Sequence, residues 1–426
     1  MSEWQQRSLA SLGNYENGFA FNELHWSEHG LPIIRIAQIT GSQGIVDCFP
    51  GVLPESYRID EGDLIFSWSG TLAVVRWSGG PAWLNQHLFK VVPAAGIDRS
   101  FLFHVLQASV AEMGKRTHGS TMKHIKRGEL REFSVEIPGN ECEQRKIAQV
   151  LDTLDTAIRE TEALIDKLKA VKQGLLHNLL TRGIDPNGQL RPPQSETPQL
   201  YKESPLGWIP REWSYGSLGT WLMGKPKNGY SPQEAGEWTG VQMLGLGCLT
   251  KEGFFGAQLK LAPAGDRGLE KALLNDGDLL ISRANTRDLV GVVGVYRDIG
   301  TPCTYPDLMM RLMPSEETSA EFLQLVLQSS KVRRQIQGSA SGTSESMVKI
   351  SSAIVTGLKV AIPKPDEQSV ILCRSKALDA QLQSELQELE VLRAIKAGLM
   401  DDLLTGRVRV TPLLKSLQQT AAQTGA

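Results

Sequence analysis

The sequence carries the same series of short motifs twice, in the same order, once in each half of the chain. Gly174 and Gly398 occupy equivalent places 224 residues apart, whereas the earliest matched motifs are only 209 residues apart, so the first parts of the two copies differ by insertions. A repeat of this length indicates a tandem duplication of a whole folding unit rather than a short solenoid repeat. Two diverged copies present two similar surfaces that differ in detail, which favours bipartite recognition. The matched motifs are Glu3-Trp4 with Glu212-Trp213, Gly62-Asp63-Leu64-Ile65 with Gly277-Asp278-Leu279-Leu280, Ile137-Pro138 with Ile362-Pro363, Glu143-Gln144 with Glu367-Gln368, and Leu179-Leu180-Thr181 with Leu403-Leu404-Thr405.

The composition is that of an ordinary globular protein. The chain has 426 residues, of which 41% are hydrophobic and 22% charged, which is enough for two domains with their own cores. A formal net charge of −2 argues against a protein that coats nucleic acid without regard to sequence, although local basic patches remain possible. Five scattered cysteines without a Cys-x-x-Cys pair disfavour a disulfide framework and a zinc site. With no apolar signal core and no long apolar stretch, we expect a cytoplasmic protein without membrane contact.

Each copy divides into a globular module and a long helix. Short apolar segments separated by Gly and Pro predict mixed helix and strand in the modules, and residues 143–183 then contain no Pro and two Gly, at positions 174 and 183. The Pro-rich stretch 184–206 is typical of a linker. We therefore expect an α+β fold with module 1 at residues 1–142, a helix at 143–183, the linker at 184–206, module 2 at 207–365, a second helix at 366–406 and a flexible tail at 407–426.

Both long helices carry an apolar seam with alternating steps of three and four residues, the spacing of a coiled coil. Two polar residues interrupt each seam at equivalent places, Thr161 and Lys172 in the first helix and Glu385 and Lys396 in the second. Since a helix of about 40 residues is about 60 Å long, it is too long to be buried against one small module. We expect the helices to pair in antiparallel orientation, with a module at either end; the alternative is that each helix packs only on its own module. The predicted seam residues are Leu151, Leu154, Ile158, Ile165, Leu168, Leu175, Leu378, Leu382, Leu389, Leu392 and Leu399.

Basic and hydroxyl side chains gather in corresponding stretches of the two modules. Such groups position phosphates and read base edges, and Arg and Asn pair bidentately with guanine and adenine. A solvated basic face is the alternative for the first stretch, and Asn285 is equally plausible as a turn residue. Lys331, Arg333 and Arg334 also lie in the second stretch. The candidate DNA-binding residues are Lys115, Arg116, His118, Ser120, Thr121, Lys123, His124, Lys126 and Arg127 in module 1, and Arg283, Asn285, Arg287, Thr343, Ser344 and Lys349 in module 2.

A catalytic site is not evident. The sequence has no Gly-x-x-x-x-Gly-Lys phosphate loop and no Asn-Pro-Pro-aromatic or Asp-Pro-Pro-aromatic motif of the kind found in adenine methyltransferases. His25, His29, His87 and His104 show no metal-ligand spacing. We expect no catalytic residues and no metal in this chain.

The order of module, helix, Pro-rich linker, module and helix resembles the specificity subunit of Type I restriction-modification systems. Three segments carry the resemblance in detail: Gly62-Asp63-Leu64-Ile65-Phe66-Ser67, Gly119-Ser120-Thr121-Met122-Lys123-His124-Ile125 and Leu206-Gly207-Trp208-Ile209-Pro210-Arg211-Glu212-Trp213. The resemblance covers nearly the whole chain. Module 2 departs from module 1 at Arg283-Ala284-Asn285-Thr286-Arg287, which leaves the recognised DNA sequence open.

The resemblance implies a non-catalytic subunit of a host-defence complex. Its two target recognition domains would each read half of an interrupted site in double-stranded DNA. Two modification subunits, which use S-adenosylmethionine to methylate adenine, would dock on it, and restriction subunits using ATP and magnesium would join them; no cofactor is expected in this chain. The runner-up hypothesis is a coiled-coil scaffold whose duplicated modules bind only proteins, and an enzyme acting alone is a third.

Overall fold

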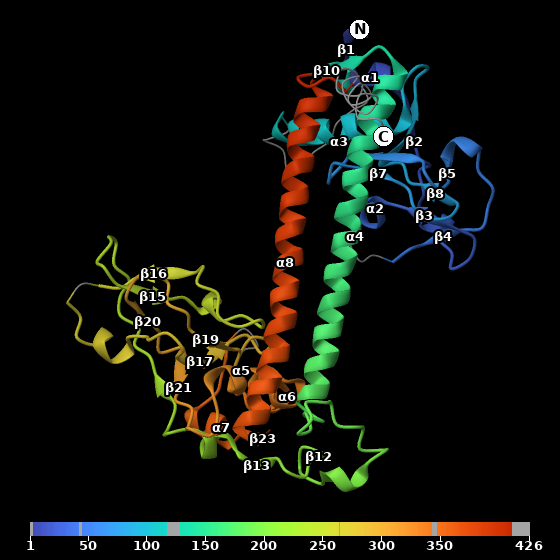
Figure 1. The fold of residues 1–426 in the computed structure, drawn as a ribbon. Coiled ribbons are helices and arrows are strands. Elements are labelled where there is room, and N and C mark those ends of the chain that lie inside the picture. The colour runs from blue at the N-terminus through green and yellow to red at the C-terminus, as the bar shows by residue number, and fades with distance from the viewer. Residues whose placement is uncertain (1–2, 42–44, 117–127, 264, 343–346, 411–426) are drawn as a thin grey trace, which may run out of the picture. The chain divides into compact units, whose positions relative to one another are not determined.

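The computed structural model describes residues 3–41, 45–116, 128–263, 265–342 and 347–410. The chain forms two compact units, Met1–Ile165 with Glu385–Ala426 and Asp166–Ser384. Each unit contains one module together with part of each long helix, α4 (Glu141–Leu179) and α8 (Pro365–Leu404) (Figure 1). The expected α+β class with two modules and two long helices is confirmed, although each module packs on segments from both helices and not only on the helix that follows it.

Module 1 contains two four-stranded sheets and a separate two-stranded ribbon. The first sheet has the order β2-β9-β6-β7 and the second β4-β3-β8-β5, while β1 pairs with β10. The strands are β1 (Trp4–Ser8), β2 (Gly13–Asn17), β3 (Leu31–Ile34), β4 (Cys48–Phe49), β5 (Arg58–Ile59), β6 (Leu64–Ser67), β7 (Ala73–Arg76), β8 (Ala82–Leu84), β9 (Leu88–Pro93) and β10 (Ser134–Pro138), and the helices are α1 (Leu9–Leu12), α2 (Ile36–Ile39) and α3 (Arg99–Arg116).

Module 2 repeats this plan. Its sheets have the orders β14-β21-β17-β19 and β16-β15-β20, and β13 pairs with β23 as β1 does with β10. The linker strand β11 (Tyr201–Lys202) pairs with β12 (Ile209–Pro210) at the start of module 2. The remaining strands are β13 (Ser214–Ser217), β14 (Lys227–Asn228), β15 (Gln242–Leu244), β16 (Leu259–Leu261), β17 (Leu279–Ser282), β18 (Ala284–Asn285), β19 (Val293–Val295), β20 (Cys303–Thr304), β21 (Met309–Leu312), β22 (Val348–Lys349) and β23 (Lys359–Ile362), and the helices are α5 (Ala320–Gln328), α6 (Ser330–Ser339) and α7 (Ser352–Gly357).

The pairing directions match as well as the strand orders. In module 1, β3 is antiparallel to β4 and parallel to β8, and in module 2, β15 is antiparallel to β16 and parallel to β20. The Gly-Asp-Leu motif of each copy leads into the strand at the same inner position of its sheet, β6 or β17. The duplication seen in the sequence is therefore a duplication of one fold.

Each module has its own core. In module 1, Phe66 from β6 packs with Phe101 and Leu102 from α3, and the cluster extends to Leu403 and Leu404 at the end of α8. In module 2, the corresponding cluster joins β17, α5 and β23 to the end of α4 and the start of α8. The helix ends thus complete the module cores, which explains why the helices do not form separate domains.

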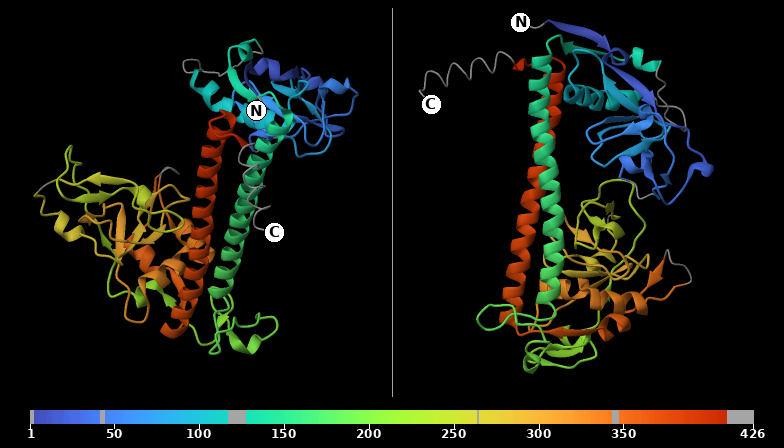
Figure 2. Two further views of the ribbon diagram at one scale, coloured as in Figure 1. Left: turned by 45° about the horizontal axis from the view of Figure 1, so that its top comes forward. Right: turned by 90° about the vertical axis from the view of Figure 1, so that its right-hand side faces the viewer.

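Within each unit, the part of α8 that belongs to it lies beside the part of α4 (Figure 2). Every predicted seam position is buried or half-buried; Leu151 is fully buried and Ile165 is only 3% exposed. The polar seam residue Thr161 is also buried, with 9% of its surface exposed. The predicted seam positions thus lie on the buried or half-buried side of each helix, and the polar Thr161 is buried as well.

Ion pairs between α4 and α8 show the relative orientation of the two helices. In unit 1, Lys396 contacts Asp155 at 2.5 Å and Arg393 contacts Glu162 at 2.6 Å. As the residue number rises along α4, the number of its partner on α8 falls, so the helices are antiparallel. The contact of Lys172 with Asp379 at 2.5 Å follows the same relation in unit 2. Lys172 and Lys396 occupy the polar places of the seams because each ammonium reaches a carboxylate of the opposite helix.

The repeated Glu-Gln dipeptide joins each module to its helix. The amide nitrogen of Gln144 donates to the carbonyl oxygens of Gly96 and Pro138, and that of Gln368 donates to Glu317 and Pro363. Both glutamines are buried, with exposed fractions of 1% and 3%. Each amide therefore satisfies backbone oxygens at the end of the preceding strand, a requirement that the two copies share.

The helices begin and end slightly earlier than predicted. α4 starts at Glu141 and ends at Leu179, after which the amide nitrogens of Arg182 and Gly183 donate to the carbonyl oxygen of Asn178. Gly183 has a φ of +65°, the left-handed conformation that commonly closes a helix. Gly406, with a φ of +72°, follows α8 in the same way.

The linker contains buried residues, and the start of the predicted flexible tail is packed. Ile184 and Tyr201 in the linker are 2% exposed. After α8, Val410 is buried in the core of module 1, and the Arg409 guanidinium lies 4.4 Å from the centre of the Trp4 ring. The prediction of a flexible tail was wrong for residues 407–410, because apolar and cation–π contacts hold them on the module. Residues 411–426 lie outside the described ranges.

Candidate nucleic-acid interface

Three of the predicted DNA-binding residues of module 2 meet on one short ladder. The chain leaves β17 at Ser282 and forms β18, which pairs antiparallel with β22 so that Ala284 lies opposite Lys349. This pairing brings Arg283 and Asn285 next to Lys349, although more than 60 residues separate them in sequence. The Lys349 side chain is exposed, while Arg283 and Asn285 are half-buried. The ladder thus brings two cations and an amide onto neighbouring backbone positions, with Arg283 and Asn285 on one face and Lys349 on the other.

Local hydrogen bonds orient this group. Arg283 Nη1 donates to the carbonyl oxygen of Asp307 at 3.3 Å, which steadies the guanidinium at the end of the strand. Asn285 Oδ1 accepts the amide hydrogen of Thr286 at 2.9 Å, so the side chain also stabilises the turn that follows. Arg287 is directed elsewhere: its Nη1 donates to the carbonyl oxygen of Gln337 on α6 at 3.0 Å. Arg283 and Asn285 therefore lie on one face of β18, Lys349 lies across the ladder on the face of Ala284, and Arg287 stabilises the packing of the loop on α6.

The other predicted residues fall mostly outside the described part of the chain. Lys115 and Arg116 are the last residues of α3, and only their backbone is described. The residues outside the described ranges are His118, Ser120, Thr121, Lys123, His124, Lys126 and Arg127 in module 1 and Thr343 and Ser344 in module 2.

The equivalent strand exit of module 1 has a different surface. Ser67, which ends β6, donates to the carbonyl oxygen of Thr71 at 2.7 Å and holds the turn that contains Ser69 and Gly70. Trp68 stands where module 2 has Arg283, and its ring is stacked against Phe89 with the centroids 5.6 Å apart. The same scaffold therefore carries an aromatic group in one copy and a guanidinium in the other.

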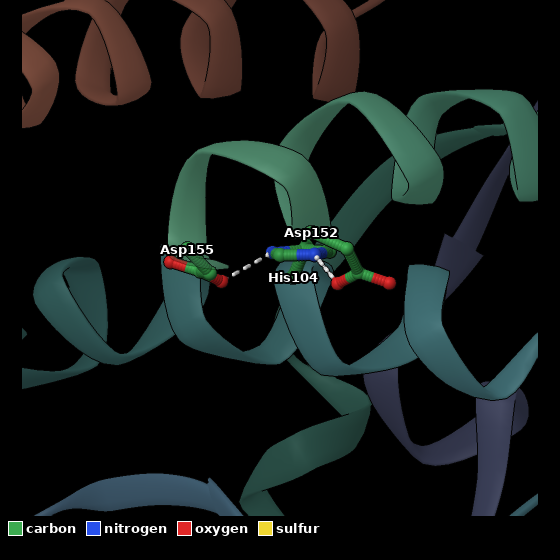
Figure 3. A group of neighbouring side chains, drawn as sticks. All are labelled: His104, Asp152 and Asp155. Atoms are coloured by element: carbon green, nitrogen blue, oxygen red, sulfur yellow. Dashed lines mark hydrogen bonds and ion pairs between the residues drawn. The ribbon is translucent and has the colours of Figure 1, made fainter. Parts of the chain in front are cut away.

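A charged cluster that the sequence did not reveal lies at the contact of α3 with α4 (Figure 3). His104 of α3 is fully buried, and its Nε2 lies 2.8 Å from Asp152 Oδ1 while its Nδ1 lies 3.9 Å from Asp155 Oδ2. Arg76 of β7 also contacts Asp152 at 2.6 Å. Lys396 of α8 contacts Asp155 and donates to Gln107. The cluster joins β7, α3, α4 and α8 within unit 1.

One ligand atom from each of His104, Asp152 and Asp155 lies within 4.8 Å of the others, which raises the question of a metal ion. Both carboxylates already have cationic partners, since Arg76 contacts Asp152 and Lys396 contacts Asp155. Burial lowers the pKa of His104, and although burial opposes ionisation of Asp152, hydrogen bonds from Arg76 and His104 lower its pKa. A divalent cation would be repelled by Arg76 and Lys396, so this arrangement suits a structural ion-pair network better than a metal site.

Two exposed helix faces repeat the same residues. Ala170, Val171 and Gly174 on α4 correspond to Ala394, Ile395 and Gly398 on α8. Val171 is 48% exposed and Ile395 is 45% exposed. A Cβ atom added to either glycine would meet nothing within 4 Å, so packing inside the chain does not require a glycine there. The sequence signal that could have revealed these faces is the repeat itself, because the repeated residues lie off the predicted seam.

The sequence is similar to known proteins over most of its length. Residues 1–170 match the family model described as the Type I restriction modification DNA specificity domain. Over 87% of its length the chain is 23% identical to the Type I restriction enzyme MjaVIII specificity subunit of Methanocaldococcus jannaschii, of which 84% is covered. It is 25% identical to the putative type I restriction enzyme MjaX specificity subunit of the same organism, with 96% of this chain and 94% of the relative covered.

The fold is also similar to that of a solved structure. The crystal structure of the Type I restriction-modification S subunit from M. genitalium matches with a TM-score of 0.56 at 15% identity, covering 95% of this chain and 96% of that one. No helix within the described ranges is both long enough and apolar enough to cross a membrane. The first 170 residues thus match the specificity-domain model, and nearly the whole chain is similar in sequence to two Type I specificity subunits and in fold to a third.

Proposed function

We propose that this chain is the DNA sequence-specificity subunit of a Type I complex, in which each module reads one half of an interrupted DNA site. The observation that carries the proposal is the strand exit after β6 and β17. Both modules reach this point with the same strand order and a buried serine, Ser67 or Ser282, and then differ in the residues they present. A duplicated scaffold with different side chains at one place is what reading two different half-sites requires.

Arg283, Asn285 and Lys349 form the reading group of module 2 in this proposal. Arg283 suits a guanine edge, Asn285 an adenine edge, and Lys349 a phosphate beside the half-site. In module 1 the reading group includes the basic stretch from Lys115 to Arg127. The antiparallel helices set the gap between the two half-sites.

The repeated helix faces support docking of two identical partners. A glycine in the middle of a helix costs about 1 kcal/mol relative to alanine, so two equivalent exposed glycines imply a benefit outside the chain. A small residue allows a partner helix to approach closely, and the half-exposed Val171 and Ile395 add apolar contact beside each glycine. The two faces would each take one modification subunit.

The partners supply the chemistry. Modification subunits would bind S-adenosylmethionine and methylate adenine, and restriction subunits would use ATP and magnesium; this chain supplies recognition and assembly and needs no cofactor of its own. Because chromosomal DNA is the target, we place the complex in the cytoplasm.

Substitution of the reading group tests the proposal directly. Arg283→Ala should weaken binding of the cognate DNA to the assembled complex by about 1–3 kcal/mol if the guanidinium reads a base, and should relax specificity at one position. Lys349→Ala should weaken binding to all sequences and reduce the salt dependence. Arg297→Ala is a matched control, because Arg297 is a cation of the same module that is paired with Asp276 and Glu321. Unchanged DNA affinity after both substitutions would exclude this placement and favour a scaffold that binds only proteins.

A further inference from the structure

A cationic pocket on α6 lies apart from the reading group. It is a hollow of about 410 Å³ lined by Lys331, Arg334 and Gln335 of α6, by Lys359 at the start of β23, and by Pro205 and Leu206 of the linker. All of these residues belong to unit 2. Two sides of the pocket are basic and the third is apolar.

The pocket is held in shape by hydrogen bonds. The Gln335 side chain makes two bonds with the backbone of Lys359: its Oε1 accepts from the amide nitrogen at 2.9 Å, and its Nε2 donates to the carbonyl oxygen at 3.0 Å. Lys331 Nζ donates to the carbonyl oxygen of Leu206 at 2.9 Å. Gln335, one helical turn after Lys331, thereby holds the backbone of Lys359 beside α6. Lys331 holds Leu206, which is part of the apolar wall of the pocket.

The positive charge in this pocket is not compensated within the described part of the chain. Lys331, Arg334 and Lys359 donate to the neutral oxygens of Leu206, Ser330 and Ser217, respectively. Other surface cations of the module have acidic partners at ion-pair distance, such as Lys260 with Glu234 and Lys251 with Asp288. Burial and the neighbouring Arg334 lower the pKa of Lys331, which shows that the group loses solvation without gaining an anion.

The pocket does not include the residues of α6 that hold the loop after β18. Arg333 and Gln337 lie on the opposite side of the helix, where Arg333 donates to the carbonyl oxygens of Val290 and Asp288, and Gln337 accepts from Arg287. Since successive residues of a helix are rotated by about 100°, Lys331 projects away from Arg333 and Gln337, while Arg334 lies on the flank between Gln337 and Lys331. The pocket and the contact of Arg287 with α6 therefore use different residues of the helix.

We propose that the α6 pocket binds an acidic segment of a protein partner, with Arg334 and Lys359 contacting its carboxylates. This inference rests on the proposed function, in which the partner is the modification subunit. A concave site with an apolar wall suits a Glu or Asp side chain, whose stem packs on Pro205 and Leu206 while the carboxylate reaches the cations. A duplex backbone, in contrast, is convex and contacts cations that project from a surface.

The test measures the affinity of the modification subunit for the full chain. Arg334→Glu with Lys359→Glu should raise the Kd by about 10-fold or more at low salt and reduce its salt dependence, because two attractive pairs become repulsive. The single variant Lys359→Gln keeps the side-chain length and should give a smaller loss in the same direction. Lys271→Glu, a change at another exposed cation of module 2, is the control and should leave the Kd unchanged.

Cross-linking identifies the contact itself. A carbodiimide joins amines to carboxylates in contact, so mass spectrometry of the wild-type complex should find Lys359 linked to an acidic peptide of the modification subunit. The inference would be overturned if no cross-link formed and if the Kd of a variant with an unaltered melting temperature did not change. An unchanged Kd with weaker DNA binding would also overturn it, because the pocket would then hold a phosphate. If the wild-type complex assembles but methylates no interrupted motif, the proposed function fails. The Kd and the cross-link still test the docking, because neither depends on methylation.

Discussion

Lys396 Nζ lies 2.5 Å from Asp155 Oδ1, and the same pair recurs as Lys172 and Asp379 at the same distance. Asp379 stands 224 residues after Asp155, and Lys396 stands 224 residues after Lys172, which is the spacing of the duplication. In one pair α4 supplies the aspartate, and in the other it supplies the lysine. The duplication thus repeats the same ion pair in each unit, with the roles of the two helices exchanged.

The two ion pairs should contribute unequally to stability. The Lys396 side chain is 13% exposed and also binds Gln107, whereas that of Lys172 is 29% exposed and its partner Asp379 is 45% exposed. Lys396→Met should lower the free energy of unfolding by about 1–3 kcal/mol, because it leaves Asp155 and Gln107 without their donor. The matched variant Lys172→Met should cost about 0–1 kcal/mol. Urea unfolding of both variants checks this, and equal losses would contradict it.

Glu367 should be essential for the junction of the linker, α8 and module 2. Its carboxylate accepts hydrogen bonds from Arg191, the amide nitrogen of Ile184 and the indole nitrogen of Trp213. Glu367→Ala should destabilise the protein by about 3–5 kcal/mol, because the buried Arg191 loses its main partner. Glu212 is the second partner of Arg191, and its side chain is 65% exposed. Glu212→Ala should therefore have little effect on stability. Limited proteolysis of the linker gives a second readout, and resistance equal to wild type would contradict the prediction.

The buried histidine predicts a pH dependence. Burial lowers the pKa of His104, which faces Asp152 and Asp155 of α4, Arg76 of β7 and Lys396 of α8. The unfolded chain therefore binds a proton at higher pH than the folded chain, starting near the ordinary value of about 6.5. The contribution to stability is fully present above about pH 6.5 and is lost as the pH falls towards the folded pKa.

His104→Leu tests the source of this pH dependence. Leu325 stands at the corresponding place of module 2, where Phe322-Leu323 and Val326-Leu327-Gln328 repeat Phe101-Leu102 and Val105-Leu106-Gln107. The variant should flatten the decrease in melting temperature between about pH 6.5 and 5. A slope that stays as steep as in the wild type would assign the dependence to another group.

The repeated helix faces predict the stoichiometry of assembly. Val171→Glu and Ile395→Glu should each remove one modification subunit, because a carboxylate would be buried in an apolar contact. Native mass spectrometry should then show one bound subunit for either single variant and none for the double variant. Leu164→Glu, at another exposed apolar position of α4, serves as the control. Two bound subunits in both single variants would exclude these faces as the docking points.

Periodicity and repetition predicted what is local in this chain. The steps of three and four residues predicted both seams. Lys172 follows Thr161 by as many residues as Lys396 follows Glu385, which predicted that the two seams share one register. The His104 cluster and the contact of Arg191 with Glu367 could not be predicted, because each joins segments far apart in the sequence and no local pattern records them. For the same reason, the sequence identified Arg283, Asn285 and Lys349 as candidate DNA-binding residues but did not show that β18 pairs with β22 and places them on one ladder.

Adenine methylation in DNA tests the central claim most directly. The chain is expressed with its modification subunit, methylated adenines are mapped by single-molecule sequencing, and residues 1–142 or 207–365 are exchanged for those of another specificity subunit. The account predicts an interrupted motif in which each exchange changes one half and leaves the other half intact. A stable complex that methylates no interrupted motif, or a motif that both exchanges change throughout, would contradict it.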